Sequence, residues 1–428
     1  MELRKFLSAI WGFLTLPVSP LPLGIYRCFF GLLALASGTF LGPDILTWFG
    51  ANGIFSPTLA AQSIGVERLD LFAWFGSSNV MVISIFATFM MSAVLTALGL
   101  FSRLAAVMLF ITITSLHHRN IYILHSGDTI IRLMSFFLML APSGAAFSID
   151  RIWRVYQGRE SPNHLIGIPP TAFRLMQIQL CLIYFSTGFW KATGGMWMDG
   201  TAVFVVNQIG QFERFPIPSL MRTLWFSKMM SWYTLGVELG APFLLWFKET
   251  RLFMLAGLIA LHAGLEYTMN IQLFQPIVVS IFVLFLTEAE ILDAWTWIGR
   301  RLTSKGIAAV HLTYGAHNLS TLRWVHVLQC LDVLNLLVFT PTDVPFVNVQ
   351  IVHAGSQVAL EGVASIRALA LRLPLVFPFG LLTLLPGASS LGNLTLRFIA
   401  SRGGAIAVPL PKATSQSKPL SDITKKVS

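Results

Sequence analysis

The chain has 428 residues, of which 55% are hydrophobic and only 11% are charged. Soluble globular proteins carry about 25% charged residues, so this composition excludes an ordinary soluble protein and indicates an integral membrane protein. The net charge of +10 does not predict nucleic-acid binding, because the lysines and arginines lie between apolar runs rather than in one patch. We therefore expect the lipid bilayer, and no nucleic acid, as the surrounding partner.

The first 19 residues pair a short basic start with an apolar stretch, as a signal peptide does, but they contain no small-x-small cleavage site. We therefore expect residues 1–19 to form an uncleaved interfacial segment. The three cysteines, Cys28, Cys181 and Cys330, lie far apart and have no histidine at ligand spacing. This pattern predicts neither a disulfide framework nor a metal site.

Eight apolar runs are long enough, or nearly so, to cross a bilayer. They cover residues 23–41, 80–100, 104–118, 129–147, 172–190, 232–247, 251–270 and 273–288. The fold class predicted for this part is an all-α polytopic membrane bundle of about eight transmembrane helices. Basic residues are concentrated at every second boundary, starting before the first run. Cytoplasmic loops keep an excess of basic residues, so we expect a multi-pass protein of the cell membrane with both termini in the cytoplasm.

The fifth run carries a polar stripe. Gln177, Tyr184 and Lys191 are seven residues apart, and Cys181 and Gly188 lie between them at three- or four-residue steps. All five therefore share one face of a helix. Lys191 has two interpretations: a functional amine that faces the bundle interior, or a residue whose long stem lifts the ammonium to the interface.

Other ionisable side chains also fall at membrane depth, where charge is costly and residues normally face the bundle interior. They are Arg27, Asp128, Arg132, Glu238 and His262, with Glu266 one turn after His262. Asp128 and Arg132 are four residues apart, so we expect them to pair on one helix face. His262 and Glu266 have the same spacing, which fits a hydrogen-bonded pair or a proton relay.

A set of motifs over about residues 20–295 resembles the HTTM family, which includes vitamin K-dependent γ-glutamyl carboxylase. The most specific is a Tyr-Phe-x-x-Gly-x-x-Lys run that ends at Lys191. The others are Tyr26-Arg27, Phe30-Gly31, Arg119-Asn120, Ser126-Gly127-Asp128, Asp150, Trp197, Gly200, Glu238 with Pro242, and His262 ahead of Met269 and Phe274. The resemblance implies Lys191 as catalytic base, with Tyr184, Gln177, Asp128, Arg132, Arg27, Glu238 and His262 lining or supporting a cavity.

The resemblance further implies reduced vitamin K or a related quinol as cofactor, a lipid quinone as partner, and a protein substrate or partner. A lysine base must be uncharged, and burial away from water favours the uncharged amine. The sequence departs from the carboxylase in two places. His125-Ser126-Gly127-Asp128 replaces its histidine-bearing stretch, and its large lumenal region has no counterpart. A non-catalytic membrane scaffold that binds partners is therefore the alternative function.

Residues 306–404 return to a soluble pattern, with strand, helix and strand expected over 308–314, 320–333 and 334–340. This order predicts a small α/β thioredoxin-like domain and resembles the DCC family of presumed thiol-disulfide oxidoreductases. That family's Asp-Gly-x-Cys-x-x-Cys motif is matched here by Tyr314-Gly315-Ala316-His317-Asn318-Leu319-Ser320, which has neither cysteine. Without a thiolate the domain should be degenerate and redox-inactive. Residues 405–428 are rich in Pro, Ser, Thr and Lys, which predicts a disordered tail.

Overall fold

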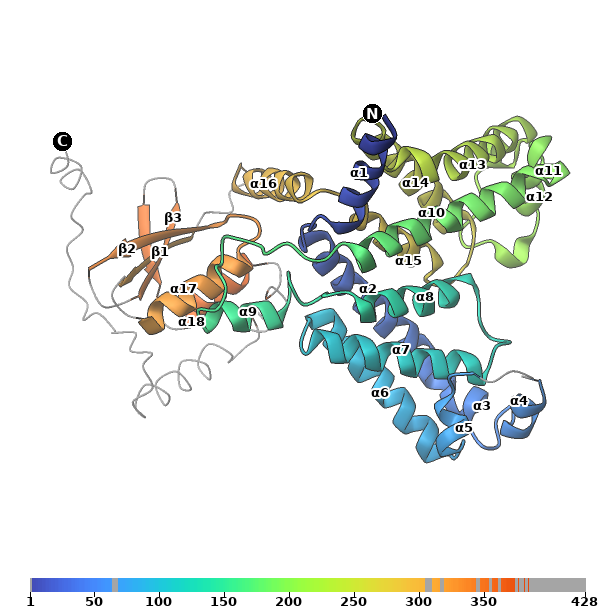
Figure 1. Ribbon diagram of the computed structural model, residues 1–428, viewed down its shortest axis with the longest axis horizontal. Coiled ribbons are helices and arrows are strands. Elements are labelled where there is room, and N and C mark those ends of the chain that lie inside the picture. Colours follow the sequence, from blue (N-terminus) through green and yellow to red (C-terminus); the bar gives the residue numbers. More distant parts are fainter. Residues whose placement is uncertain are drawn as a thin grey trace. The chain divides into compact units, whose positions relative to one another are not determined.

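The computed structural model describes residues 2–63, 68–304, 310–315, 319–343, 347–353, 356–360, 363–373, 376, 381 and 384. The chain divides into two compact units (Figure 1). The first holds Met1–Arg154 and His164–Ile291, and the second holds Val155–Asn163 and the described residues from Leu292 onward. The predicted disordered tail at 405–428 and the motif residues 316–318 lie outside the described residues.

Helices make up the first unit, whose last helix continues into the second (Figure 1). The long helices are α1 Glu2–Thr15, α2 Leu21–Leu41, α6 Asn79–Leu98, α7 Ser102–Arg119, α8 Ser126–Leu140, α10 Thr171–Ala192, α13 Leu224–Leu244, α14 Lys248–Thr268 and α16 Glu288–Ser304. The short ones are η1 Gly42–Asp44, α3 Ile45–Phe49, α4 Pro57–Ser63, α5 Leu71–Phe75, α9 Ile149–Tyr156, α11 Gly195–Met198, α12 Ala202–Val206, η2 Gly210–Phe212, η3 Ser219–Arg222, α15 Phe274–Ile281 and η4 Phe282–Phe285.

Each of the eight apolar runs in the sequence coincides with a helix in the structure. Two stretches, Leu21–Phe49 and Asn79–Leu98, are long and apolar enough to cross a membrane, and Phe274–Phe285 is a shorter apolar helix. The fourth run, 129–147, was predicted too long, because α8 already ends at Leu140. Pro142 follows directly, and the residue before a proline is pushed away from helical geometry.

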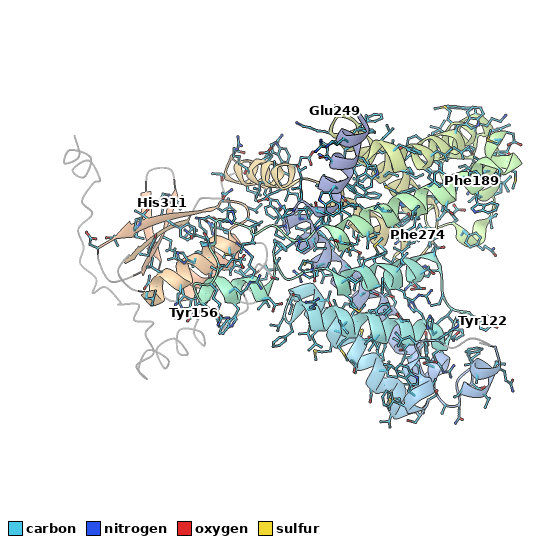
Figure 2. The ribbon with its side chains drawn as sticks, viewed as in Figure 1. Tyr122, Tyr156, Phe189, Glu249, Phe274 and His311 are labelled. Atoms are coloured by element: carbon cyan, nitrogen blue, oxygen red, sulfur yellow. The ribbon has the colours of Figure 1, made fainter. Side chains whose placement is uncertain are left out.

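Large apolar side chains lie exposed on the outer faces of these helices, as a lipid-facing surface requires. Val80 at the start of α6 is 76% exposed and Phe253 on α14 is 79% exposed. Phe189, labelled in Figure 2, is 51% exposed on α10. Soluble proteins rarely expose so many large apolar groups together, so this surface favours contact with lipid.

Arg27 and Asp150 hold the turn between α6 and α7. Arg27 is fully buried and donates to the carbonyls of Thr96 and Ala97 at the end of α6, and to those of Ser143 and Phe147 after α8. Asp150 accepts from the backbone N–H of Phe101 and of Ser102 at 2.8 Å each, at the start of α7. The two charges therefore satisfy helix ends that have no partner within their own helices.

Gly31 allows α2 and α6 to pack backbone to backbone. A Cβ at this position would overlap backbone atoms of Ala97 and come within 2.9 Å of the carbonyl oxygen of Ala93. We expect Gly31→Ala to lower the stability of the detergent-solubilised protein by about 1–3 kcal/mol, because backbone cannot move aside as a side chain does. Gly264→Ala is the matched control, since a Cβ at Gly264 of α14 meets nothing within 4 Å. Equal melting temperatures for the two variants would contradict this close packing.

A four-stranded sheet forms the centre of the second unit (Figure 1). Its elements are β1 Val310–Gly315, α17 Leu319–Leu331, β2 Leu337–Thr342, β3 Val347–His353, β4 Ser356–Leu360 and α18 Val363–Ala370. The strand order is β2-β1-β3-β4, with β1 and β2 parallel and the other neighbours antiparallel. Strand, helix and parallel strand thus follow one another where the sequence analysis expects them.

Candidate functional site

Lys191 and Glu238 form a close ion pair between α10 and α13. The Lys191 ammonium, Nζ, donates to both carboxylate oxygens of Glu238, at 2.5 and 2.6 Å. The Glu238 side chain is only 8% exposed and that of Lys191 is 25% exposed. Nζ also lies 5.2 Å from the ring centre of Trp197, within cation–π range. The amine is therefore bound by partners and does not extend freely toward the interface.

Gly188 allows α10 and α13 to approach each other closely beside this ion pair. A Cβ at Gly188 would lie 3.3 Å from Cβ of Glu238 and 3.0 Å from the nearest side-chain atom of Leu239. Any larger residue would push α13 away from α10. The glycine one turn before Lys191 thus brings the carboxylate of Glu238 within reach of the amine.

A second buried chain of hydrogen bonds starts two turns earlier on the same face of α10. The Tyr184 hydroxyl lies 2.7 Å from Nε2 of His262 on α14, and Nδ1 of His262 contacts Oε1 of Gln275 on α15. The three residues are 4%, 4% and 2% exposed, respectively. With the Gln275 oxygen as acceptor, Nδ1 carries the ring proton and Nε2 accepts from Tyr184.

Aromatic rings enclose His262. The ring of Phe274, labelled in Figure 2, lies 6.3 Å from the imidazole, and that of Phe282 lies 5.8 Å away. Such walls keep water away and strengthen the hydrogen bonds inside. The cluster formed by Lys191, Glu238, Tyr184, His262 and Gln275 is hereafter called the α10 cluster. It contains a cation, a carboxylate, a phenol and an imidazole within the helical unit, which are groups that can take part in proton transfer.

Two other predicted residues are buried, but they do not contact the α10 cluster. Gln177 does lie on the buried face of α10, yet it donates to the carbonyl of Leu284 at 2.7 Å and accepts from Arg174 at 2.9 Å. Within the part of the chain that the structure describes, Arg27 donates to the backbone carbonyls named above. Their role as residues that line or support a cavity at Lys191 stays a prediction, since their hydrogen bonds go to groups outside the α10 cluster.

Asp128 and Arg132 do not form the expected pair. Asp128 accepts from the backbone N–H of His125 at 3.0 Å and closes a capping box at the start of α8. No ion pair joins Asp128 to Arg132 in this described part of the chain. Asp128 instead helps to line a separate cavity of about 270 Å³, together with His117 and His125.

The partner expected for His262 was also wrong. Glu266 pairs with Arg214 at the outer end of α14, while His262 binds Tyr184 and Gln275. Gln275 was missed, although an amide in an otherwise apolar run is itself a signal of a buried hydrogen bond. Among the described residues, no three His, Cys, Asp or Glu side chains are grouped so that they could hold a metal ion.

Comparison with known proteins gives one match. The HTTM domain matches residues 16–289, which is the region that contains the α10 cluster and all eight apolar runs. No curated protein and no solved structure matches the chain. HTTM proteins are vitamin K-dependent carboxylase-like membrane proteins. With most of its length covered by this domain and with apolar helices exposed on its surface, the chain belongs to the HTTM family and associates with a membrane.

Proposed function

We propose that the protein is a multi-pass membrane enzyme with quinol-linked, carboxylase-like chemistry, in which Lys191 is the base. The observation that carries this proposal is the contact of Nζ with both oxygens of Glu238 inside a helical bundle. A lysine that acts as a base must first lose its own proton. Glu238 is placed to accept it, because transfer from Nζ to a carboxylate oxygen converts the ion pair into an uncharged amine and carboxylic acid.

A quinol bound beside the α10 cluster is the cofactor that this chemistry would require. A bound quinol supplies a weakly acidic hydroxyl and two reducing equivalents. The uncharged Lys191 amine would accept the hydroxyl proton and become an ammonium again, held beside Trp197. Tyr184, His262 and Gln275 would keep the neighbouring bundle dry and fixed, since each has a hydrogen-bond partner within it.

The alternative function is a non-catalytic scaffold or partner-binding protein. The absence of both motif cysteines near residues 317 and 320 agrees with a chain that has lost chemistry in one part.

We further propose eight membrane crossings, both termini in the cytoplasm, and a degenerate thioredoxin-like domain of the DCC type over residues 306–404. The strand order β2-β1-β3-β4, with its parallel β1 and β2, supports the thioredoxin-like assignment. The domain limits proposed are therefore 1–19, 20–295, 306–404 and 405–428.

The test compares the wild type with Lys191→Ala in lipid nanodiscs supplied with chemically reduced vitamin K and oxygen. Quinol oxidation is followed by absorbance, and carboxylation by uptake of labelled bicarbonate into a glutamate-containing peptide. We expect turnover by the wild type and a loss of at least about 100-fold in the variant, as removal of a general base produces. Equal turnover in both proteins would reject Lys191 as the base. A folded wild type without turnover would favour the scaffold.

A further inference from the structure

A second site lies at the other end of α10. A cavity of about 410 Å³ opens where α2, α10 and α14 begin, beside α1. Its lining includes the apolar residues Phe13, Pro22, Trp246 and Phe285, together with two arginines, Arg174 and Arg251. None of these residues belongs to the α10 cluster.

Arg174 has few partners for a residue with five donor hydrogens. Its Nη1 donates to Oε1 of Gln177 at 2.9 Å, and its guanidinium lies 4.2 Å from the ring centre of Phe13. Its Nε is buried without a partner. Within the described part of the chain, Nη2 donates no hydrogen bond and no carboxylate pairs with this guanidinium. A charge in such surroundings is costly unless an anion compensates it.

Arg251 is only partly compensated. Its Nη2 donates to Oε1 of Glu290 at 2.6 Å, while its Nε is buried without a partner. Nη1 makes no hydrogen bond with any residue that the structure describes. Arg174 and Arg251 both stand in the first turn of their helices, where the backbone adds positive potential. The arrangement suits a phosphate, which guanidinium groups bind through paired donors.

The acidic residues decide which phosphate compound fits. Glu288 also lines the cavity, and Glu290 is bound to Arg251. The two arginines and two glutamates at the cavity thus have no net charge in sum, although no carboxylate pairs with Arg174, so a ligand with net negative charge would leave an excess negative charge. A ligand that carries a phosphate and an ammonium would match both signs, with the ammonium toward Glu288.

We propose that this cavity binds one phosphatidylethanolamine molecule. Its phosphate accepts hydrogen bonds from Nη2 of Arg174 and Nη1 of Arg251, and its ammonium lies near Glu288. Its acyl chains follow the apolar wall that includes Trp246 and Phe285. The membrane association of the helical unit makes such a lipid available. The lipid site is independent of the chemistry proposed for Lys191.

The first experiment measures binding to delipidated wild-type protein in detergent. It is titrated with short-chain phosphatidylethanolamine, short-chain phosphatidylglycerol and inorganic phosphate. We expect phosphatidylethanolamine to bind at least about tenfold more tightly than phosphatidylglycerol, because only phosphatidylethanolamine has an ammonium group that can form a charge-assisted hydrogen bond with Glu288. Inorganic phosphate should not compete. Equal affinity for the two lipids, or full competition by phosphate, would overturn the proposal.

Three variants keep the test independent of folding. Arg174→Gln should weaken phosphatidylethanolamine binding by at least about tenfold, whereas Arg103→Gln, which changes an exposed arginine at the start of α7, should not. Among the described residues, none forms a hydrogen bond with the Glu288 side chain that the substitution Glu288→Gln would break. Glu288→Gln should therefore fold normally and shift the preference toward phosphatidylglycerol. Unchanged selectivity in Glu288→Gln, or wild-type binding by Arg174→Gln, would contradict the site.

Discussion

Glu238→Ala will destabilise the helical unit by about 3–5 kcal/mol, which is the cost of leaving a buried charge without its partner. The carboxylate is 8% exposed and holds Nζ of Lys191 through both oxygens. Removing it leaves the ammonium between α10 and α13 without this carboxylate, beside the face of Trp197. The measurement is unfolding of the detergent-solubilised protein by sodium dodecyl sulfate, followed by circular dichroism.

A double-mutant cycle supplies the control for this prediction. Lys191→Ala combined with Glu238→Ala removes both charges, so it should cost less than the sum of the two single changes. Glu249→Ala, at an exposed position of α14, should change stability by less than about 0.5 kcal/mol. Strictly additive losses in the cycle would show that the two groups do not interact in the folded protein.

Arg27→Met will lower stability by at least about 3 kcal/mol, because each buried acceptor left without a donor costs about 1–3 kcal/mol. The guanidinium is fully buried and binds four backbone carbonyls, two at the end of α6 and two after α8. Methionine fills a similar length without any donor. Thermal unfolding in detergent measures the effect.

Arg103→Met is the matched control for Arg27→Met, because Arg103 is exposed at the start of α7. We expect its melting temperature to stay within about 1–2 °C of the wild type, as surface substitutions usually do. Arg27→Lys should recover only part of the loss, since an ammonium carries three donors instead of a planar fork of five. Equal stability of Arg27→Met and the wild type would show that the carbonyls find other partners.

The positions of the helices could be predicted because the length and the apolar character of each run can be read directly from the sequence. The ends were less predictable. α8 stops at Leu140 ahead of Pro142, and α13 begins at Leu224, well before the predicted residue 232. Ser227 and Ser231 are fully buried in that first part of α13. Because serine is polar, these residues shorten the apolar run from which the helix was predicted. Hydropathy detects helices that face lipid. It does not detect a helical segment whose polar side chains are buried against other parts of the protein.

The face of α10 could also be predicted, since Tyr184, Gly188 and Lys191 follow helical spacing within one element. The partners from other helices could not, because a single sequence holds no information on which helices meet. Asp128 shows a related limit. Both Asp128 and Arg132 lie in α8, but that helix begins at Ser126, so Asp128 falls in its first turn. There it serves the unpaired backbone N–H of His125.

The most direct test of Lys191 as a base is Lys191→Arg, measured for both turnover and stability. Arginine keeps the positive charge and presents a planar pair of donors that suits the two oxygens of Glu238. We therefore expect the variant to be as stable to unfolding as the wild type. A guanidinium does not give up its proton in proteins, so we expect quinol oxidation to fall by at least about 100-fold. Full turnover by a stable Lys191→Arg protein would contradict the role of this amine as the proton acceptor.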